Sequence, residues 1–180
     1  MTASADRLLL LRLARDAIVA HVSGLPVPTP ELAGIFGRRG GGFVSLHTKE
    51  GSLRGCIGHL EENDPLGHVI VRCAVAAASE DPRFPKVAPT ELHTIQIEVS
   101  LLGPVEAIAG PLDIEIGRHG LMIQRGRCRG LLLPQVATEC QWDAHTFLAH
   151  TCRKAGLSED SWRNGAKLWR FEAEVFAETA

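Results

Sequence analysis

Two stretches of alternating apolar and polar residues, 43–49 and 52–58, surround the dipeptide Glu50-Gly51. Alternation with period two is typical of strands with one buried face, and a glycine between two such stretches permits the positive φ of a tight turn. The pattern therefore predicts an antiparallel hairpin. In its simplest register Ser45 lies opposite Cys56 and His47 lies opposite Arg54.

Further strands and helices follow from the same reasoning. Thr94 to Leu102 alternates cleanly and predicts a half-buried strand. A second hairpin is expected over 121–125 and 128–133, and a last strand over 169–176. Helical patterns occupy residues 8–22, 64–80, 134–140 and 143–154. Because strand pairs and helices mix without regular β-α-β units, the sequence indicates an α+β protein.

The composition limits the classes of protein that remain. A chain of 180 residues, 45% hydrophobic and 22% charged, can bury one or two small cores, and we expect a single domain over residues 1–180. Its net charge of −2 provides no strong field for nucleic acid or an anionic membrane. Few aromatic residues accompany the basic segments at 38–39 and 125–129, so nucleic-acid binding is not favoured.

The cysteines and the N-terminal segment indicate a cytoplasmic protein. The five cysteines are an odd number and contain no C-x-x-C pair, which fits a reducing compartment. Arg12 and Arg15 interrupt the apolar run that begins at Leu8, so neither a signal peptide nor a membrane span is expected.

The predicted hairpin gives Cys56 the surroundings of a reactive thiol. Val44, Leu46, Leu53 and Ile57 are expected on one face, and Ser45, His47, Arg54 and Cys56 on the other. A guanidinium beside Cys56 favours the thiolate, and His47 can serve as a base. Gly55 and Gly58 allow a ligand or another backbone segment to approach closely. The alternative is that Cys56 fills space as a small apolar residue, the role expected of Cys73, Cys140 and Cys152.

Other residues carry weaker signals. Glu98 is either a carboxylate partner for His or Arg or a solvent-facing charge, and His119 precedes a strand, where side chains often point into clefts. The turn Asp81-Pro82-Arg83-Phe84 places Asp81 to cap a helix end or to pair with Arg83.

Metal and cofactor signatures are weak. Cys56-x-x-His59 has no second ligand pair at zinc-like spacing, and only a site built through space from His47, His59 and His119 stays open. Neither a phosphate-binding glycine loop nor another cofactor motif occurs, so we expect no metal and no cofactor.

Several motifs together resemble one family. Leu53-Arg54-Gly55-Cys56-Ile57-Gly58 is similar to the signature hexapeptide of the AMMECR domain family. Further motifs match in order: residues 81–84, 99–102, 118–121, 132–137, 142–143 and 154–156. They resemble most closely its bacterial branch, AmmeMemoRadiSam system protein A. The resemblance implies two unequal lobes with antiparallel strands, flanking helices and a cleft between the lobes. It also implies a Memo-type, dioxygenase-like protein and a radical SAM enzyme as partners.

The resemblance does not assign a reaction, so the residues must suggest one. We expect a cytosolic enzyme or enzyme subunit that acts on a small molecule, with Cys56 as the nucleophile of an acyl or alkyl transfer. Arg54 would bias its charge or bind an anionic group of the substrate, and His47 or His119 would handle protons. Binding roles are expected for Ser45, Gly55, Gly58, Arg83 and Glu98. The alternative is a non-catalytic module that holds a partner in the same cleft.

Overall fold

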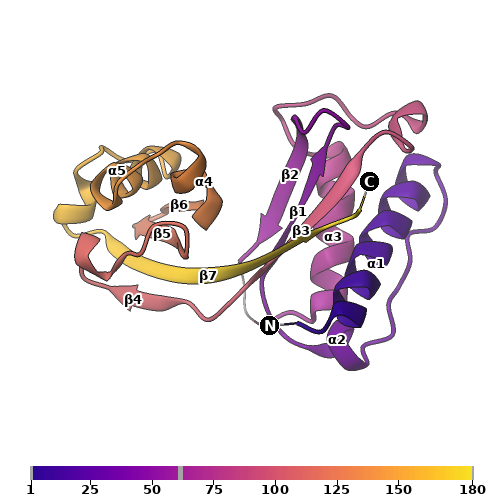
Figure 1. Ribbon diagram of the computed structural model, residues 1–180, viewed down its shortest axis with the longest axis horizontal. Coiled ribbons are helices and arrows are strands. Elements are labelled where there is room, and N and C mark those ends of the chain that lie inside the picture. The colour runs from indigo at the N-terminus through magenta and orange to yellow at the C-terminus, as the bar shows by residue number, and fades with distance from the viewer. Residues whose placement is uncertain (1, 61–62, 180) are drawn as a thin grey trace. The chain divides into compact units, whose positions relative to one another are not determined.

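The structure, a computed structural model, describes residues 2–60 and 63–179 as helices and antiparallel strands (Figure 1). Two compact units divide the chain: unit 1 takes in the described residues up to Leu102 and again from Glu174, and unit 2 is Gly103–Ala173. The expected α+β class with flanking helices is confirmed. The single domain over residues 1–180 and a cleft between the lobes stay predictions.

Unit 1 is an antiparallel sheet covered on one face by two helices. Its strands follow the order β2-β1-β3, and the end of β7 lies beside β3. Helices α1 and α3 cover the same face (Figure 1), and they bury the apolar side chains of β1 and β3. The bounds are α1 Ser4–Val22, β1 Gly42–His47, β2 Leu53–His59, α3 Leu66–Ser79, β3 Gln96–Leu102 and β7 Lys167–Ala177.

Short elements connect these parts. The segment between α1 and β1 contains one turn of helix, α2 Gly34–Gly37, and the segment between α3 and β3 contains the 3-10 turn η1 Pro89–Glu91. Asp64, the first residue of the helical pattern at 64–80, does not cap α3, since Pro65 holds the N-cap position and no described side chain caps it. The Asp64 carboxylate instead contacts His59 and Arg72.

The first hairpin follows the predicted register only away from its turn. Ser45 pairs with Cys56 as expected, but His47 pairs with Leu53 rather than with Arg54. The loop has three residues, 49–51, because the N–H of Thr48 donates to the carbonyl oxygen of Ser52, and Gly51 ends the loop with φ +85°. Beyond this loop the register shifts again between Leu46 and His47, where a bulge leaves Arg54 without a partner in β1 and restores the predicted pairing of Ser45 with Cys56.

The strands of unit 2 pack on a core that is separate from the core of unit 1. β7 pairs with β4 and with β5, and β5 pairs with β6, all antiparallel. Helices α4 and α5 pack their apolar residues against Leu121, Ile123 and Leu168. The bounds are β4 Glu106–Ile108, η2 Pro111–Asp113, β5 His119–Arg125, β6 Cys128–Leu132, α4 Pro134–Glu139, α5 Ala144–Lys154 and η3 Ser161–Arg163. The alternation at 169–176 predicted β7, whereas β4 was not predicted.

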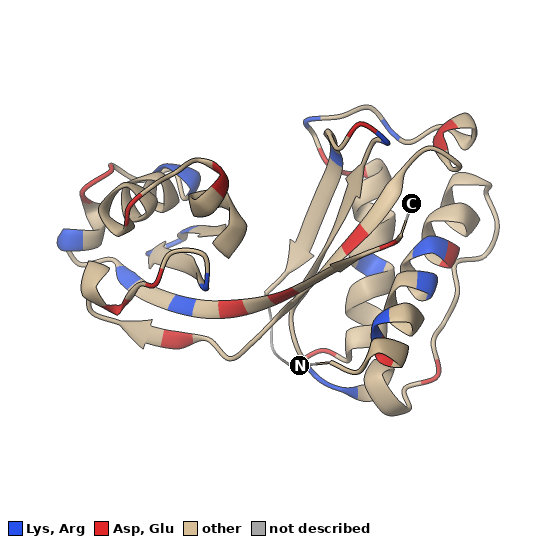
Figure 2. Ribbon diagram, viewed as in Figure 1, with Lys and Arg blue, Asp and Glu red and all other residues tan. Residues whose placement is uncertain are grey.

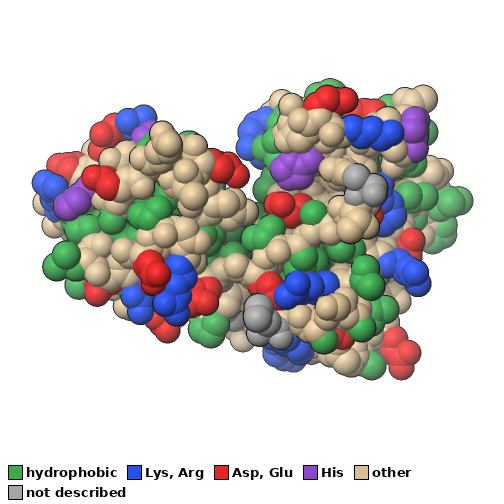
Figure 3. All heavy atoms as spheres, in the orientation of Figure 1, with side chains coloured by type: hydrophobic (Ala, Val, Ile, Leu, Met, Phe, Trp, Pro, Cys, Tyr) green, Lys and Arg blue, Asp and Glu red, His purple; other side chains and the backbone are tan. Residues whose placement is uncertain are grey.

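Acidic and basic residues occur side by side in both units, as expected for a net charge of −2 (Figure 2). On the face of the molecule drawn in Figure 3 they are interspersed rather than gathered by sign. None of the helices in residues 2–60 and 63–179 has the length and apolar character needed to cross a membrane.

Candidate active site around Cys56

Three polar residues form a row across the sheet of unit 1. Ser45 of β1 pairs with Cys56 of β2 on one side and with Glu98 of β3 on the other. Val44 and Leu46, which flank Ser45 in sequence, are fully buried against the helices. Because side chains alternate across a strand, Ser45 and its two partners lie on the face away from α1 and α3.

Within this row the Ser45 hydroxyl donates a hydrogen bond to the Cys56 sulfur, with 3.2 Å between Oγ and Sγ. His47, two residues along β1, places its Nε2 3.9 Å from a carboxylate oxygen of Glu98. The structure therefore brings together four of the residues singled out from the sequence, namely Ser45, His47, Cys56 and Glu98.

The turn after α3 holds the backbone of Cys56 from outside the sheet. The N–H of Cys56 donates to Asp81 Oδ2 at 2.9 Å, and the Arg83 guanidinium donates to the Cys56 carbonyl oxygen at 3.4 Å. Arg83 also pairs with Asp81 at 2.7 Å, as the sequence suggested. Because these backbone groups point away from β1, Ser45 and Cys56 form a non-hydrogen-bonded pair, in which side chains come closer together.

The surroundings of the thiol keep it protonated. Burial raises the pKa of Cys56, although the Ser45 hydroxyl and the positive charge of Arg83 act in the opposite direction. The negative charges of Asp81 and Glu98 add to the rise in the pKa. The expectation of a lowered pKa and a resting thiolate was therefore wrong. The sequence reasoning about the pKa of Cys56 did not include the negative charges of Asp81 and Glu98.

Arg54 does not act on Cys56 as expected. Its guanidinium pairs with Glu91 at 2.8 Å and donates to the carbonyl oxygens of Pro85 and Lys86. The guanidinium next to the thiol is that of Arg83. The physical reason is the bulge in β2, which removes Arg54 from the pairing with His47. Leu53, expected on the apolar face, instead pairs with His47 and is 38% exposed.

The two glycines of the hexapeptide are packed against protein atoms. A Cβ at position 55 would lie 2.3 Å from the carbonyl oxygen of Ala77 in α3, and one at position 58 would lie 2.0 Å from the ring of Phe43. Of the two expected uses of these glycines, the close approach of another backbone segment is confirmed at Gly55, and protein atoms rather than a ligand fill the space at both positions. They allow close contact with a helix on one face and an aromatic ring on the other.

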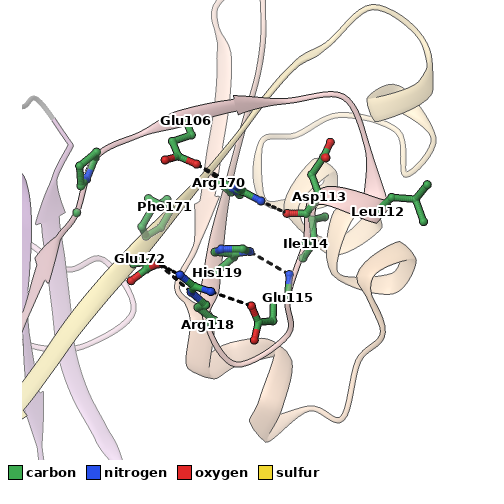
Figure 4. A pocket seen from close by; sticks show the side chains of 12 residues that line it. Glu106, Leu112, Asp113, Ile114, Glu115, Arg118, His119, Arg170, Phe171 and Glu172 are labelled. Atoms are coloured by element: carbon green, nitrogen blue, oxygen red, sulfur yellow. Dashed lines mark hydrogen bonds and ion pairs between the residues drawn. The ribbon is translucent and has the colours of Figure 1, made fainter.

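His119 belongs to unit 2, at the start of β5, and its predicted role beside Cys56 stays a prediction. Its side chain lies in a cavity of that unit with Arg118 and Arg170 on either side (Figure 4). Burial and these two positive charges lower the pKa of His119, so its imidazole is neutral at neutral pH.

The other cysteines and the histidines complete the comparison with the sequence. Cys73 and Cys152 are buried as expected, whereas Cys140, expected to pack, is exposed together with Cys128. Among residues 2–60 and 63–179 no group of three or more His, Cys, Asp or Glu side chains could hold a metal ion.

Sequence reasoning missed the role of Asp81 as the acceptor for the backbone N–H of Cys56. Only the position of β2 at the edge of the sheet reveals that this N–H needs an acceptor outside the sheet.

Comparison with known proteins identifies the family. The family model described as AMMECR1 matches residues 11–176. The chain belongs to the AMMECR1 family. The family resemblance seen in the sequence is thus confirmed, while membership of the bacterial AmmeMemoRadiSam branch stays a prediction.

AMMECR1 relatives from archaea match nearly the whole chain. A protein from Methanothermobacter thermautotrophicus is 46% identical, covering 94% of this chain and 92% of its own, and one from Methanosarcina acetivorans is 45% identical, covering 93% and 89%. Among solved structures, the uncharacterized protein PH0010 from Pyrococcus horikoshii is similar with a TM-score of 0.88. It is 40% identical and covers 94% of this chain and 90% of its own.

Proposed function

We propose that this AMMECR1 protein is a cysteine-dependent enzyme or enzyme subunit that accepts an acyl or alkyl group from a small molecule on Cys56. The observation that carries the proposal is the row of Glu98, Ser45 and Cys56, with a hydroxyl 3.2 Å from the sulfur and a carboxylate on the same face. A protonated thiol that acts as a nucleophile needs a neighbouring group to carry its proton away and a base to accept that proton.

Because the resting thiol is protonated, the reaction begins with a proton transfer. The Ser45 hydroxyl can rotate, accept the proton of Cys56 and pass its own to Glu98, whose carboxylate lies 3.9 Å from His47 Nε2. The sulfur then forms a bond to the acyl or alkyl carbon. The bond from that carbon to its leaving group breaks, and the leaving group departs with the electron pair.

Arg83 and Asp81 have supporting roles in this proposal. Asp81 fixes the backbone of Cys56, and Arg83, whose side chain is 48% exposed, supplies a positive charge next to the sulfur. This charge stabilises the thiolate once the proton has left. The expected Arg54 contribution is thereby assigned to Arg83, and His119 is not part of the proposed reaction.

The structure offers a control for testing this reaction, since Cys128 is exposed and lies far along the chain in β6. The protein is incubated with a simple thioester and with an acyl phosphate, and the modified cysteines are mapped by peptide mass spectrometry. We expect Cys56 to be acylated faster than Cys128, although Cys128 is more exposed. Glu98→Gln should slow acylation of Cys56 by about tenfold or more and leave Cys128 unchanged. Acylation of Cys128 with Cys56 untouched would overturn the proposal.

A non-catalytic partner-binding module is the second candidate, and two observations favour it. The pKa of Cys56 is raised by burial, and both neighbouring glycines are explained by packing. For this function Cys56 is a small residue that packs beside Ser45 on the face of the sheet away from the helices. The expected Memo-type and radical SAM partners are tested by co-purification with the wild-type protein and with Cys56→Ser. Binding that survives the substitution, with no acylation of Cys56, would favour the module.

A further inference from the structure

Unit 2 contains a cavity of about 500 Å³ that the proposed reaction does not use. It is lined by residues before, within and after η2, by the start of β5 and by β7, all of them in unit 2. The close-up in Figure 4 shows the imidazole of His119 between the side chains of Arg170 and Arg118, with glutamate side chains around them. A cavity of this size can enclose a small metabolite.

The Nε2–H of His119 has no hydrogen-bond acceptor among the described residues. Its side chain is buried, at 7% exposure, and its Nδ1 accepts the backbone N–H of Glu115 at 2.9 Å. A neutral imidazole whose Nδ1 is an acceptor carries its proton on Nε2. Among the described residues no hydrogen-bond partner is found for that Nε2–H. Because His119 lines the cavity, an Nε2–H without an acceptor in the protein is a place for an acceptor atom of a ligand.

Two arginines add further donors at fixed positions. Arg118 is held by Glu172 at 2.8 Å and by Glu115 at 3.1 Å. Arg170 is held by Glu106 at 2.9 and 3.0 Å and donates to the carbonyl oxygen of Asp113. A guanidinium has five N–H groups, and three are used in each case, so two donors remain on each arginine. Together with His119 they form a positive centre suited to a carboxylate.

The glutamates that hold the arginines add a second kind of binding group. Glu106, Glu115 and Glu172 each use one carboxylate oxygen in these pairs, and the other oxygen has no partner among the described residues. Their side chains are each about three-fifths exposed. With Asp113, the cavity has four acidic and two basic side chains, which disfavours a ligand that carries only negative charge.

We propose that this cavity binds an α-amino acid as its zwitterion. The carboxylate of the ligand would accept from His119 Nε2–H and from the free N–H groups of Arg118 and Arg170. Its ammonium group would donate to the free oxygens of the glutamates. Ile114 and Phe171, the apolar side chains beside His119, would contact the ligand's side chain. This inference is independent of the reaction proposed for Cys56.

Three probes separate the parts of the proposed recognition. L-leucine carries both charges, 4-methylpentanoate lacks the ammonium group, and 3-methylbutylamine lacks the carboxylate. Isothermal titration calorimetry on the whole chain should show saturable binding of L-leucine to one site. Each truncated probe should bind about tenfold more weakly or worse, because a charge-assisted hydrogen bond is lost. Equal binding of 4-methylpentanoate would show an anion site and would overturn the proposal, as would no saturable binding of millimolar L-leucine.

Two variants locate the binding. His119→Asn keeps an acceptor for the Glu115 N–H but removes the Nε2 donor, and Glu172→Gln removes one negative charge while its amide can still accept from Arg118. Each should weaken L-leucine binding about tenfold. The control is Glu159→Gln, a glutamate of unit 2 that pairs with Arg153 outside the cavity. Wild-type affinity in both cavity variants, with folding checked by circular dichroism, would also overturn the proposal.

Discussion

The carboxylate of Asp81 accepts a hydrogen bond from the backbone N–H of Cys56 at 2.9 Å. The two residues are 25 positions apart, and the contact attaches the turn after α3 to the edge of β2. Asp81 also accepts from the backbone and the side chain of Arg83. A nearly buried carboxylate with this many donors fixes the position of the backbone that carries the thiol.

Replacing Asp81 with Ala should lower the free energy of unfolding by about 3 kcal/mol, because it leaves the Cys56 N–H without an acceptor and Arg83 without its partner. Urea denaturation followed by circular dichroism measures the loss. The control is Glu159→Ala, which breaks an exposed ion pair with Arg153 and should cost about 0.5 kcal/mol or less. Equal losses in the two variants would contradict the assigned role of Asp81.

The same contact should make the stability depend on acid pH. The hydrogen bonds from Arg83 hold the pKa of Asp81 well below its usual range. A carboxyl group with a lowered folded pKa stabilises the protein above its unfolded pKa of about 3.9, and this stabilisation is lost progressively as the pH falls below that value. The difference in unfolding free energy between wild type and Asp81→Asn should therefore shrink as the pH falls from about 5 to about 2. A difference that stays constant over this range would argue against the lowered pKa.

The hairpin shows how far the sequence alone could lead. Alternation placed Ser45 opposite Cys56, and Ile97 and Val99 in the core, because burial of one sheet face fixes which residues point inward. The same alternation could not distinguish a two-residue loop from a three-residue loop at Gly51. The longer loop pairs His47 with Leu53, and a bulge further along β2 leaves Arg54 unpaired in the sheet, where its guanidinium contacts Glu91.

The candidate site was predictable where it depends on neighbours in one sheet, and not where it depends on distant segments. Glu98 could be placed on the polar face of its strand, but its position beside Ser45 needed the pairing of β1 with β3. The charges that raise the pKa of Cys56 come from the turn at Asp81 and from β3. No spacing rule in the sequence brings those segments together.

Substituting Gly55 with Ala should destabilise unit 1 by about 3 kcal/mol, because the new Cβ would lie 2.3 Å from a backbone carbonyl oxygen of α3 and the helix would have to move. Gly110→Ala is the matched control, since nothing lies within 4 Å of its Cβ position and its φ of 173° is extended backbone that alanine adopts readily. Thermal unfolding of both variants tests this. A Gly55→Ala protein as stable as Gly110→Ala would mean that the space beside β2 is open, as the ligand alternative from the sequence requires.

The titration of Cys56 connects the structure to the proposed reaction. Its pKa is raised by burial, so the rate of alkylation by iodoacetamide, followed at this residue by mass spectrometry, should reach half its maximum at a pH above the usual cysteine value of about 8.5. Ser45→Ala removes the hydroxyl that donates to the sulfur, and the midpoint should move still higher. The exposed Cys128 gives the reference rate in the same experiment. A midpoint for Cys56 below that of Cys128 would mean that the thiolate is already present at rest, and the proton transfer through Ser45 to Glu98 would then be unnecessary.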